Sequence, residues 1–304
     1  MIKMKICMYS SYRNECDPTQ YLQKHDFHSH NEFEIYLFHS GNCNYLIHNK
    51  VYHLQPNDIL IMNGLTLHRP NPIPTEKYIR SVLNFSAEAL QSVIESLKFP
   101  DILKPFHDYN HTLYRGVDTE LVKKIEYSLK DIAELNETFE KQENRDILIT
   151  PLVYEAKMKT YIIQLLFHIY ELNQTHKCDN PHVESEKQQH VKRITSWIEE
   201  HFHEEITLDD ISKNLNLSKY YMSHIFKEIT GGTIMKYLMS CRVNRAKILL
   251  ETELNLSILE VALESGFKHS SHFSRFFLQK VGITPLEYRK RTRIATKGKL
   301  SNLK

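Results

Sequence analysis

Glycine, proline, tryptophan and cysteine are all scarce in this chain. Its 304 residues include 8 Gly, 10 Pro, 1 Trp and 5 Cys. So little glycine and proline excludes a fibrous or low-complexity chain, because those classes need one or both in abundance. The five cysteines, at positions 7, 16, 43, 178 and 241, contain no Cys-x-x-Cys pair and no even disulfide framework. They predict reduced thiols, as in a cytosol.

Long apolar runs are missing as well. The opening residues, MIKMKICMYSSYRNE, hold no run long enough for a signal peptide. The most apolar window, 161–170, is about ten residues long and is broken by Gln164 and His168, so it cannot span a bilayer. We also find no glycine-rich phosphate loop, no Ser-His-Asp signature and no nucleophilic cysteine context. The sequence predicts a cytoplasmic protein with no membrane partner and no cofactor.

Charge is distributed unevenly along the chain. Residues 213–304 carry 17 Lys and Arg against 6 Asp and Glu, whereas residues 1–212 carry 22 against 31. The formal net charge of +2 therefore combines a basic C-terminal third with an acidic remainder. A concentrated basic segment suits double-stranded DNA, because phosphate neutralisation releases counterions. On charge alone, an ordinary solvated helical surface is the alternative.

The basic third repeats one pattern, over 207–231 and again over 257–282. Each copy has a short amphipathic helix, a tight turn and a second helix with apolar residues at i, i+3 and i+4. Ser218 is a good N-cap for one second helix, and Gly266 suits a positive φ in the other turn. This is the helix-turn-helix plan, whose second helix can enter a DNA major groove. Capping-box pairs begin both first helices: Thr207 with Asp210, and Ser257 with Glu260.

Two motifs in the second copy carry a family resemblance. GF-x3-S-x-FSRFF, from Gly266, and VG-x-TP-x-EYR, from Val281, resemble the C-terminal signature of the AraC/XylS family of bacterial transcription regulators. The resemblance covers residues 191–291 and extends to the first copy and to the helix between the copies. One departure is Leu278 and Gln279, where the family usually carries a Lys. The resemblance implies an N-terminal sensor domain and a C-terminal double helix-turn-helix domain.

Short β-prone runs fill residues 26–85 and are separated by turn formers, which indicates a sandwich or small barrel. The family resemblance makes this a cupin-like barrel, and residues 1–24 are expected to be a polar arm packed on it. The fold class is thus α+β multidomain: an N-terminal cupin-like (jelly-roll) β-barrel with dimerisation helices, then an all-α double helix-turn-helix domain. We expect a sensing and dimerisation domain at 1–175, a linker at 176–189, a DNA-binding domain at 190–293 and a basic tail at 294–304.

Helical periodicity follows the barrel, over 87–97, 119–139 and 151–172. The apolar surface of the last two helices must be covered by the barrel, by each other or by a second subunit. The resemblance implies a homodimer through these helices, with Leu129 and Ile132 in the interface. Packing within one chain is the alternative.

The two second helices supply the predicted DNA contacts. In the first, we expect base or sugar contacts from Tyr220, Ser223 and His224, with phosphate contacts from Lys219 and Lys227. In the second, Arg275 suits a guanine, although a phosphate-binding or structural role is equally compatible. Its neighbours His269, Ser270, Ser271 and His272 complete the predicted surface. The resemblance implies the same DNA contacts at these positions.

Two further groups of arginines have different expected roles. Arg242, on the connecting helix, matches a family position that usually braces the two halves of the domain through buried polar contacts. Residues 289–291 and Arg293 are expected to form a frayed tail near phosphates.

A histidine-rich string marks the expected sensor site. His28-x-His30-x3-Glu34-x6-Gly41 fits the first metal motif of the cupin superfamily, and Asn63-Gly64-x3-His68 approximates the second with an Asn in place of the expected Pro. A Zn, Fe or Mn site built from His28, His30, Glu34 and His68 is therefore one interpretation. We favour a metal-free ligand pocket that uses the same side chains. Tyr36, Tyr45 and Arg69 join this pocket as candidates, since sugars favour aromatic faces with a few polar groups.

The function that these patterns favour is a DNA-binding transcription regulator controlled by a small molecule, with carbohydrate as the ligand class that the family suggests. Its partners would be double-stranded DNA, a second copy of the chain and RNA polymerase, and it would not be an enzyme. The alternative is a metal-dependent cupin enzyme, an oxygenase or isomerase, fused to a DNA-binding domain. An architectural DNA binder is disfavoured, because it would not need the N-terminal domain.

Overall fold

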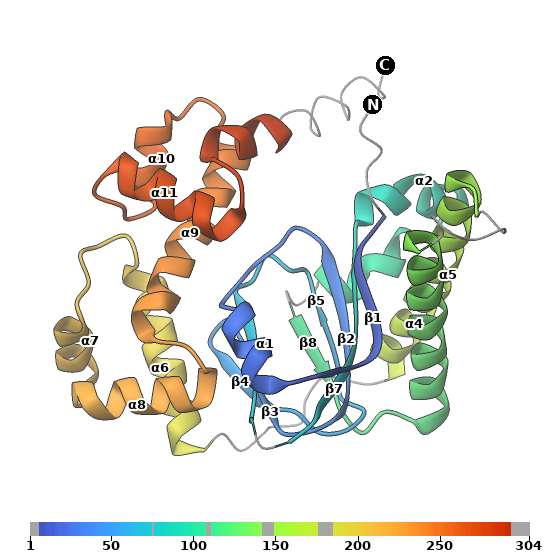
Figure 1. The fold of residues 1–304 in the computed structure, drawn as a ribbon, viewed down its shortest axis with the longest axis horizontal. Helices are drawn as coiled ribbons and strands as arrows, with labels where there is room; N and C mark the ends of the chain where they lie inside the picture. Colours follow the sequence, from blue (N-terminus) through green and yellow to red (C-terminus); the bar gives the residue numbers. More distant parts are fainter. Residues whose placement is uncertain (1–5, 75, 108–110, 142–148, 176–184, 293–304) are drawn as a thin grey trace. The chain divides into compact units, whose positions relative to one another are not determined.

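The chain forms two compact units, which a computed structural model describes over residues 6–74, 76–107, 111–141, 149–175 and 185–292 (Figure 1). The first unit takes residues 1–47 and 51–183, and the second takes 184–304 with 48–50. Most of the expected linker, 176–184, and the expected basic tail, 294–304, lie outside the described residues. Within the described part of the chain, no helix is both long and apolar enough to cross a membrane.

Two β-sheets form the body of the N-terminal unit. The larger has the strand order β1-β7-β2-β5-β8, and each of its pairings is antiparallel. The smaller has the order β4-β3-β6. This arrangement confirms the predicted β domain of many short strands. The strands are β1 (Cys7–Cys16), β2 (Phe33–Ser40), β3 (Cys43–Ile47), β4 (Lys50–His53), β5 (Ile59–Met62), β6 (His68–Pro72), β7 (Tyr78–Phe85) and β8 (His111–Tyr114).

Strand β2 lies at the centre of the larger sheet and is covered on both faces. Ile35 and Leu37 belong to the core cluster shared with the helices, whereas Tyr36 and Phe38 belong to a cluster shared with β3 of the smaller sheet. This alternation follows from the two-residue period of a strand. Because both faces are covered, β2 has a nearly continuous apolar sequence, and Glu34 is buried on the face that meets the smaller sheet.

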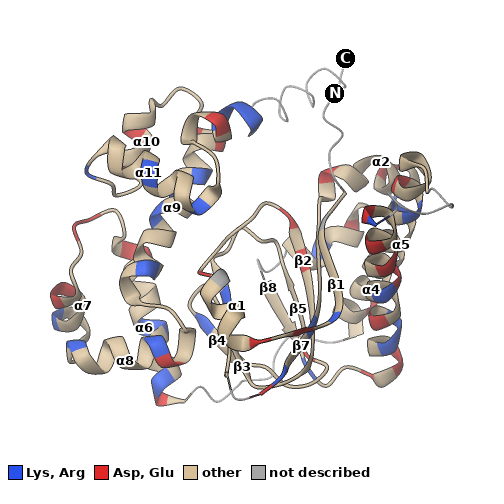
Figure 2. Ribbon diagram, viewed as in Figure 1, with Lys and Arg blue, Asp and Glu red and all other residues tan. Residues whose placement is uncertain are grey.

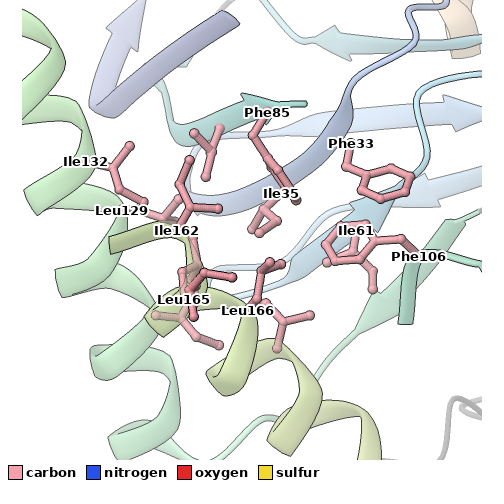
Figure 3. Packing of buried hydrophobic residues seen from close by; sticks show 14 of the residues in the cluster. Phe33, Ile35, Ile61, Phe85, Phe106, Leu129, Ile132, Ile162, Leu165 and Leu166 are labelled. Carbon is pink, nitrogen blue, oxygen red and sulfur yellow. The ribbon is translucent and has the colours of Figure 1, made fainter. Parts of the chain in front are cut away.

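Helices α4 and α5 cover the other face of the larger sheet. Figure 3 shows Leu129 and Ile132 of α4 and Ile162 of α5 in one cluster with the sheet residue Ile35. Leu129 is 1% exposed and Ile132 is 0% exposed. The prediction that these two residues form a dimer interface is wrong, because the chain's own sheet covers them. The helices of this unit are α1 (Pro18–Lys24), α2 (Ala87–Leu97), the 3-10 turn η1 (Pro100–Leu103), α3 (Lys104–His107), α4 (Thr119–Glu140) and α5 (Pro151–Thr175).

Residues 7–24 do not form the expected polar arm. Strand β1 pairs with β7 along its length, and helix α1 follows with Asp17 as its N-cap. As an edge strand, β1 takes its backbone hydrogen bonds from one neighbour and leaves its second edge to solvent. Its polar sequence is compatible with that position, which is why local hydrophobicity did not reveal it.

The C-terminal unit is a set of helices that contains the two predicted helix-turn-helix motifs. Both capping boxes are present, Thr207 with Asp210 and Ser257 with Glu260. Gly266 has φ +84°, as its place in the second turn predicted. The helices are α6 (Glu186–His201), α7 (Leu208–Leu215), α8 (Lys219–Thr230), α9 (Ile234–Thr252), α10 (Ile258–Glu264) and α11 (Ser270–Val281).

Helix α6 begins earlier than the sequence suggested. Residues 185–189 were expected to be linker, with the helix starting at Val191. In the structure Ser185 is the N-cap of the helix. Its hydroxyl accepts a hydrogen bond from the backbone amide of Gln188, and its own backbone amide donates to the side chain of Gln188, which completes a capping box. These reciprocal bonds satisfy two amides and allow a polar segment to begin a helix.

Candidate DNA-binding surface and sensor site

Helix α8 separates its apolar and polar residues onto opposite faces. Met222 and Phe226 are fully buried, whereas Tyr220 is 83% exposed. Ser218 caps the helix by accepting a hydrogen bond from the amide of Tyr221, as predicted. The predicted contact residues therefore face away from the core of the unit: Lys219, Tyr220, His224 and Lys227 are exposed and Ser223 is half-buried.

Helix α11 repeats this division in the second motif. Phe273 and Phe277 are fully buried and pack into one cluster with the connecting helix α9. Phe276, expected in the core, is only half-buried and packs against that cluster. The predicted contact residues again lie outside it: His269, Ser271, His272 and Arg275 are exposed and Ser270 is half-buried.

The charges around α8 include acidic partners. Lys219 Nζ lies 2.9 Å from Asp209 Oδ1 of α7, and both side chains are more than half exposed. His224 Nδ1 lies 3.6 Å from Glu228, whose carboxylate also receives Lys187. Exposed ion pairs of this kind contribute about 0–1 kcal/mol, so a phosphate can replace the acidic partner at little cost. Figure 2 shows Lys and Arg together with Asp and Glu on the helices of the unit.

Arg242 braces the domain, as expected from its position. Its Nε donates to the carbonyl of Phe202 and its Nη2 to the carbonyl of Glu204, each at 2.8 Å. Gly266 makes this approach possible, because a Cβ there would lie 2.5 Å from the Phe202 oxygen and 2.9 Å from Arg242 Nε. One side chain thus joins α9, the end of α6 and the turn of the second motif.

Arg289 does not belong to a frayed tail. It is 8% exposed, and its Nη1 donates to the carbonyl of Leu256 at 2.6 Å. Its role is to hold the C-terminal segment against the loop before α10, so the expected phosphate role is wrong for this residue. Lys290 and Arg291 are exposed, and Arg293 lies outside the described residues.

In the N-terminal unit, the structure brings together the four residues of the predicted metal motif. His28 and His30 lie in the loop before β2, Glu34 lies in β2, and His68 begins β6. One ligand atom from each histidine lies within 4.8 Å of the others. His30 Nε2 is 3.0 Å and His68 Nε2 is 3.8 Å from Glu34 Oε2. We call these four side chains the sensor quartet.

Both sheets contribute to the sensor quartet, and an isolated bridge joins the loop residue His28 to His68 of β6. The backbone amides and carbonyls of His28 and His68 exchange hydrogen bonds of 3.2 and 3.0 Å. His28 and His30 are partly exposed, whereas Glu34 and His68 are buried. The quartet therefore has an open side, at the loop, and a closed side, between the sheets.

Burial and mutual contact set the protonation of the quartet. Burial, followed by the neighbouring His28, lowers the pKa of His68 to about 3, so this ring is neutral. Burial alone would raise the pKa of Glu34, but the hydrogen bond with His30 and the other rings lower it to about 2. Burial would lower the pKa of His30, and the hydrogen bond to Glu34 raises it instead. An ionised carboxylate thus lies beside His30, which is hydrogen-bonded to it, and beside a neutral His68 whose Nε2 can donate an electron pair.

Two of the other predicted ligand residues are close to the quartet and one is not. Tyr45 donates from its hydroxyl to Glu34 Oε1 at 3.3 Å, and its ring packs edge-on against Tyr36. The Tyr36 hydroxyl in turn lies 2.6 Å from the hydroxyl of Tyr78. Arg69 instead makes its contacts with Asp26, at 3.2 Å, and with the ring of Phe27.

Asn84 is a site residue that the sequence analysis missed. Its Nδ2 donates to Glu34 Oε2 and lies the same distance, 3.2 Å, from His30 Nε2. It stands opposite Glu34 in the pairing of β2 with β7. The alternation of Tyr78, Arg80, Val82 and Asn84 along β7 was the signal that could have assigned it to the interior.

Arg80 is a second interior residue that sequence analysis missed. It is 5% exposed, lies over the rings of Tyr21 and Tyr78, and donates to Cys16 Sγ at 2.7 Å. Among the described residues it meets no carboxylate. A buried cation held by aromatic faces and a thiol, without a carboxylate, is costly unless something else compensates it.

Comparison with known proteins relates both units to one family. The helix-turn-helix domain model matches residues 211–291, and the AraC-like ligand binding domain model matches residues 16–135. The melibiose operon regulatory protein of Escherichia coli (strain K12) is 30% identical over 119 residues, which are 39% of each chain. The aligned part therefore spans less than half of that relative.

Two other comparisons extend this result. YbfI, an uncharacterized HTH-type transcriptional regulator of Bacillus subtilis (strain 168), is 25% identical over 83% of this chain and 82% of its own. The solved C-terminal domain of AraT, a response regulator from Geobacillus stearothermophilus, is 30% identical, covers 35% of this chain and 88% of its own, and has a TM-score of 0.34.

The fold and its exposed recognition helices define a helix-turn-helix protein with its own ligand-binding domain. Within that class, the chain belongs to the AraC/XylS family of transcription regulators. The resemblance that rested on the motifs at Gly266 and Val281 is confirmed.

Proposed function

We propose that this chain is a sequence-specific DNA-binding transcription regulator, controlled by a small molecule bound in its N-terminal unit. The observation that carries the proposal is the pair of helices α8 and α11. Each buries an apolar face in the core and exposes a face of basic, hydroxyl and imidazole side chains. Such a face suits a major groove, where base edges and phosphates are both within reach.

The effector-binding part of the proposal rests on the interior polar groups of the N-terminal unit. His30, Glu34, Tyr45 and Asn84 form one hydrogen-bonded group, and His28 and His68 lie beside it. A few aimed polar groups among aromatic side chains are typical of small-molecule sites. The similarity to the melibiose operon regulatory protein supports carbohydrate as the ligand class. Regulation of RNA polymerase, in the cytosol, completes the proposal, and the four described cysteines are free thiols as that compartment requires.

The proposal also includes self-association as a homodimer. The proposed interface is the outer surface of α4 and α5, and not the buried surface around Leu129 and Ile132 that the sequence suggested. The outer sides of α4 and α5 expose Tyr127 (63%) and Leu152 (73%), while their inner sides are buried in the chain's own core. A homodimer through this outer surface would place two DNA-binding domains on one operator, as two-fold pairing of regulators commonly does.

A second candidate function is a metal-dependent enzyme, and the sensor quartet is the observation that favours it. Three imidazoles and a carboxylate can hold a catalytic metal. We favour the regulator, because the relatives are named as regulators across most of this chain's length.

Selection from a randomised duplex library tests the regulator. Full-length protein should enrich one motif with two boxes about one helical turn apart, because two recognition helices on one domain read adjacent major grooves. Tyr220→Ala and Arg275→Ala should each degrade one box and leave the other. Enrichment without any base preference would contradict the proposal.

A further inference from the structure

Each histidine of the sensor quartet is anchored by the same ring atom. The Nδ1 atoms of His28, His30 and His68 lie 2.8, 3.0 and 2.8 Å from backbone carbonyls. A carbonyl only accepts, so each Nδ1 must carry the proton and donate it. The carbonyls belong to Asp26, Glu32 and Thr66.

This anchoring leaves Nε2 of each ring for a further contact, and in His30 and His68 that atom faces Glu34. His30 Nε2 lies 3.0 Å from Glu34 Oε2, and His68 Nε2 lies 3.8 Å from the same oxygen. Among the described residues, the buried Nε2 of His68 has no hydrogen-bond partner. Asn84 and Tyr45 already donate to Glu34 from behind. Several electron-pair donors therefore converge, and the contacts among the described residues leave the lone pair of His68 Nε2 unmatched.

A proton on His30 Nε2 would satisfy the contact between His30 and Glu34, but it would leave His68 Nε2 without a partner. A metal ion would satisfy all of these electron-pair donors, because it accepts an electron pair from each ligand at once. Backbone carbonyls that hold the far nitrogen of a histidine are also the usual outer support of metal-binding imidazoles, since they fix the tautomer and the ring orientation. We propose that the sensor quartet binds a divalent transition-metal ion through His28, His30 and His68 Nε2 and the carboxylate of Glu34.

The donor set limits the kind of metal. Three imidazole nitrogens and one carboxylate suit Zn²⁺, Fe²⁺, Co²⁺, Ni²⁺ or Mn²⁺. Ca²⁺ and Mg²⁺ prefer oxygen ligands, and Cu⁺ prefers sulfur, which the quartet lacks. The partly exposed His28 and His30 leave the ion a route from solvent on the loop side.

Gly64 is the positioning residue for this site. Its φ is +74°, and its carbonyl accepts from the amide of His30 at 2.8 Å. A Cβ at this position would lie 2.3 Å from His30 Nδ1 and 2.2 Å from the carbonyl oxygen of Glu32. Any side chain there would push His30 and its anchor apart, so glycine is required for His30 to face the quartet.

Metal titration of full-length, tag-free protein tests the proposal. Protein stripped by a chelator should bind one Co²⁺ per chain and develop visible absorption bands that Zn²⁺ then displaces. His28→Gln and His30→Gln, chosen because both residues are partly exposed, should weaken Co²⁺ binding at least tenfold while the far-UV circular dichroism stays unchanged. Gly64→Ala should weaken it as well, although it removes no ligand.

His53→Gln is the matched control, because His53 is an exposed histidine on β4 of the same domain. It should bind Co²⁺ as the wild type does. The proposal is overturned if stripped wild-type protein binds no Co²⁺, or if His28→Gln and His53→Gln bind it equally. The metal titration does not depend on the proposed regulatory function. If the protein failed to bind DNA, the result of the Co²⁺ titration would be the same.

Discussion

Arg242 Nε donates to the carbonyl oxygen of Phe202 at 2.8 Å and so links the middle of the connecting helix to the end of α6. The same guanidinium reaches the Glu204 carbonyl. Two carbonyls at a helix end, which have no partner in their own helix, are thus satisfied by one side chain. The relative positions of the two recognition helices depend on this contact, because α9 connects the two motifs.

Arg242→Met should therefore destabilise the C-terminal unit by about 1.5–3 kcal/mol, because it removes hydrogen bonds from a charged group to two carbonyls. The exposed Arg245, one turn away, provides the control, and Arg245→Met should change stability by less than about 0.5 kcal/mol. The single tryptophan, Trp197, lies in α6. Its fluorescence during urea unfolding of the full chain reports on this unit. Equal urea midpoints for Arg242→Met and Arg245→Met would show that the hydrogen bonds of Arg242 do not stabilise the unit.

The boundary of the DNA-binding domain gives a second prediction. A fragment of residues 184–293 should fold and bind DNA alone, whereas the originally expected fragment, 190–293, lacks the capping box of α6 and should be less stable. In the full chain, Ser185→Ala removes only the cap and should cost about 1 kcal/mol. Thermal unfolding followed by circular dichroism compares the two fragments. If 190–293 is as stable as 184–293, the first turn of α6 contributes nothing to the domain.

The helix-turn-helix motifs were predictable because their signals are local. A hydroxyl and an acid three residues apart, as in Thr207 and Asp210, specify a helix start without knowledge of the rest of the chain. The same signal, Ser185 and Gln188, was present at α6 but was hidden in a polar segment. The start of α6 was therefore missed because the polar composition of the segment was taken to indicate a linker.

The β domain was predictable in class but not in detail, because its contacts are non-local. The polar sequence of β1 gains its hydrogen bonds from β7, which lies more than sixty residues away in the chain. Periodicity correctly predicted that Leu129 would be buried, but periodicity does not specify whether a sheet or a second subunit covers it. Asn84 and Arg80 could be assigned to the interior only once the register of β7 was known.

Self-association gives a third prediction. Tyr127→Glu combined with Leu152→Glu should convert a dimer to a monomer, because both side chains are exposed and a charge there costs nothing in the isolated chain. Leu129→Glu should instead unfold the N-terminal unit, since it places a charge in the core. Sedimentation at micromolar concentration measures the first effect and circular dichroism the second. A wild-type protein that sediments as a monomer would remove the basis for a dimer.

The pH dependence of stability gives a fourth prediction, through His39. Its Nε2 accepts from the Ser81 hydroxyl at 2.7 Å, and that hydroxyl accepts from the backbone amide of Arg13. Burial, followed by the charge of Arg13, lowers the pKa of His39 to about 4. In the unfolded chain a histidine titrates near pH 6.5. As the pH falls from about 6.5 to 4, the unfolded chain takes up a proton that the folded chain does not, so this residue lowers stability over that range.

His39→Asn should therefore show a weaker loss of stability between pH 7 and pH 4.5 than the wild type. The measurement is the urea midpoint of the N-terminal unit at both values, followed by far-UV circular dichroism. His53→Gln, at an exposed position, should keep the wild-type dependence. If the wild type and His39→Asn lose stability in parallel, His39 is already protonated in the folded protein.

The last prediction separates base recognition from phosphate binding on the two recognition helices. Arg275 and His272 are exposed on α11, and Lys227 is exposed on α8. A base contact carries sequence information, whereas a phosphate contact does not. Arg275→Ala should lose about 1–3 kcal/mol on the cognate site and relax the preference at one or two base pairs. Lys227→Ala should weaken cognate and random DNA alike and reduce the salt slope by about one unit.

Phe277→Ala provides the folding control for these variants. Phe277 is fully buried, and its removal should open a cavity that costs about 3–5 kcal/mol. Binding to a randomised operator library at two salt concentrations distinguishes the outcomes. If Arg275→Ala changes only the salt response and leaves the base preference intact, Arg275 holds a phosphate. Specificity would then rest on Tyr220, Ser223 and His224 of the first motif, because these side chains form the other exposed face that can reach base edges.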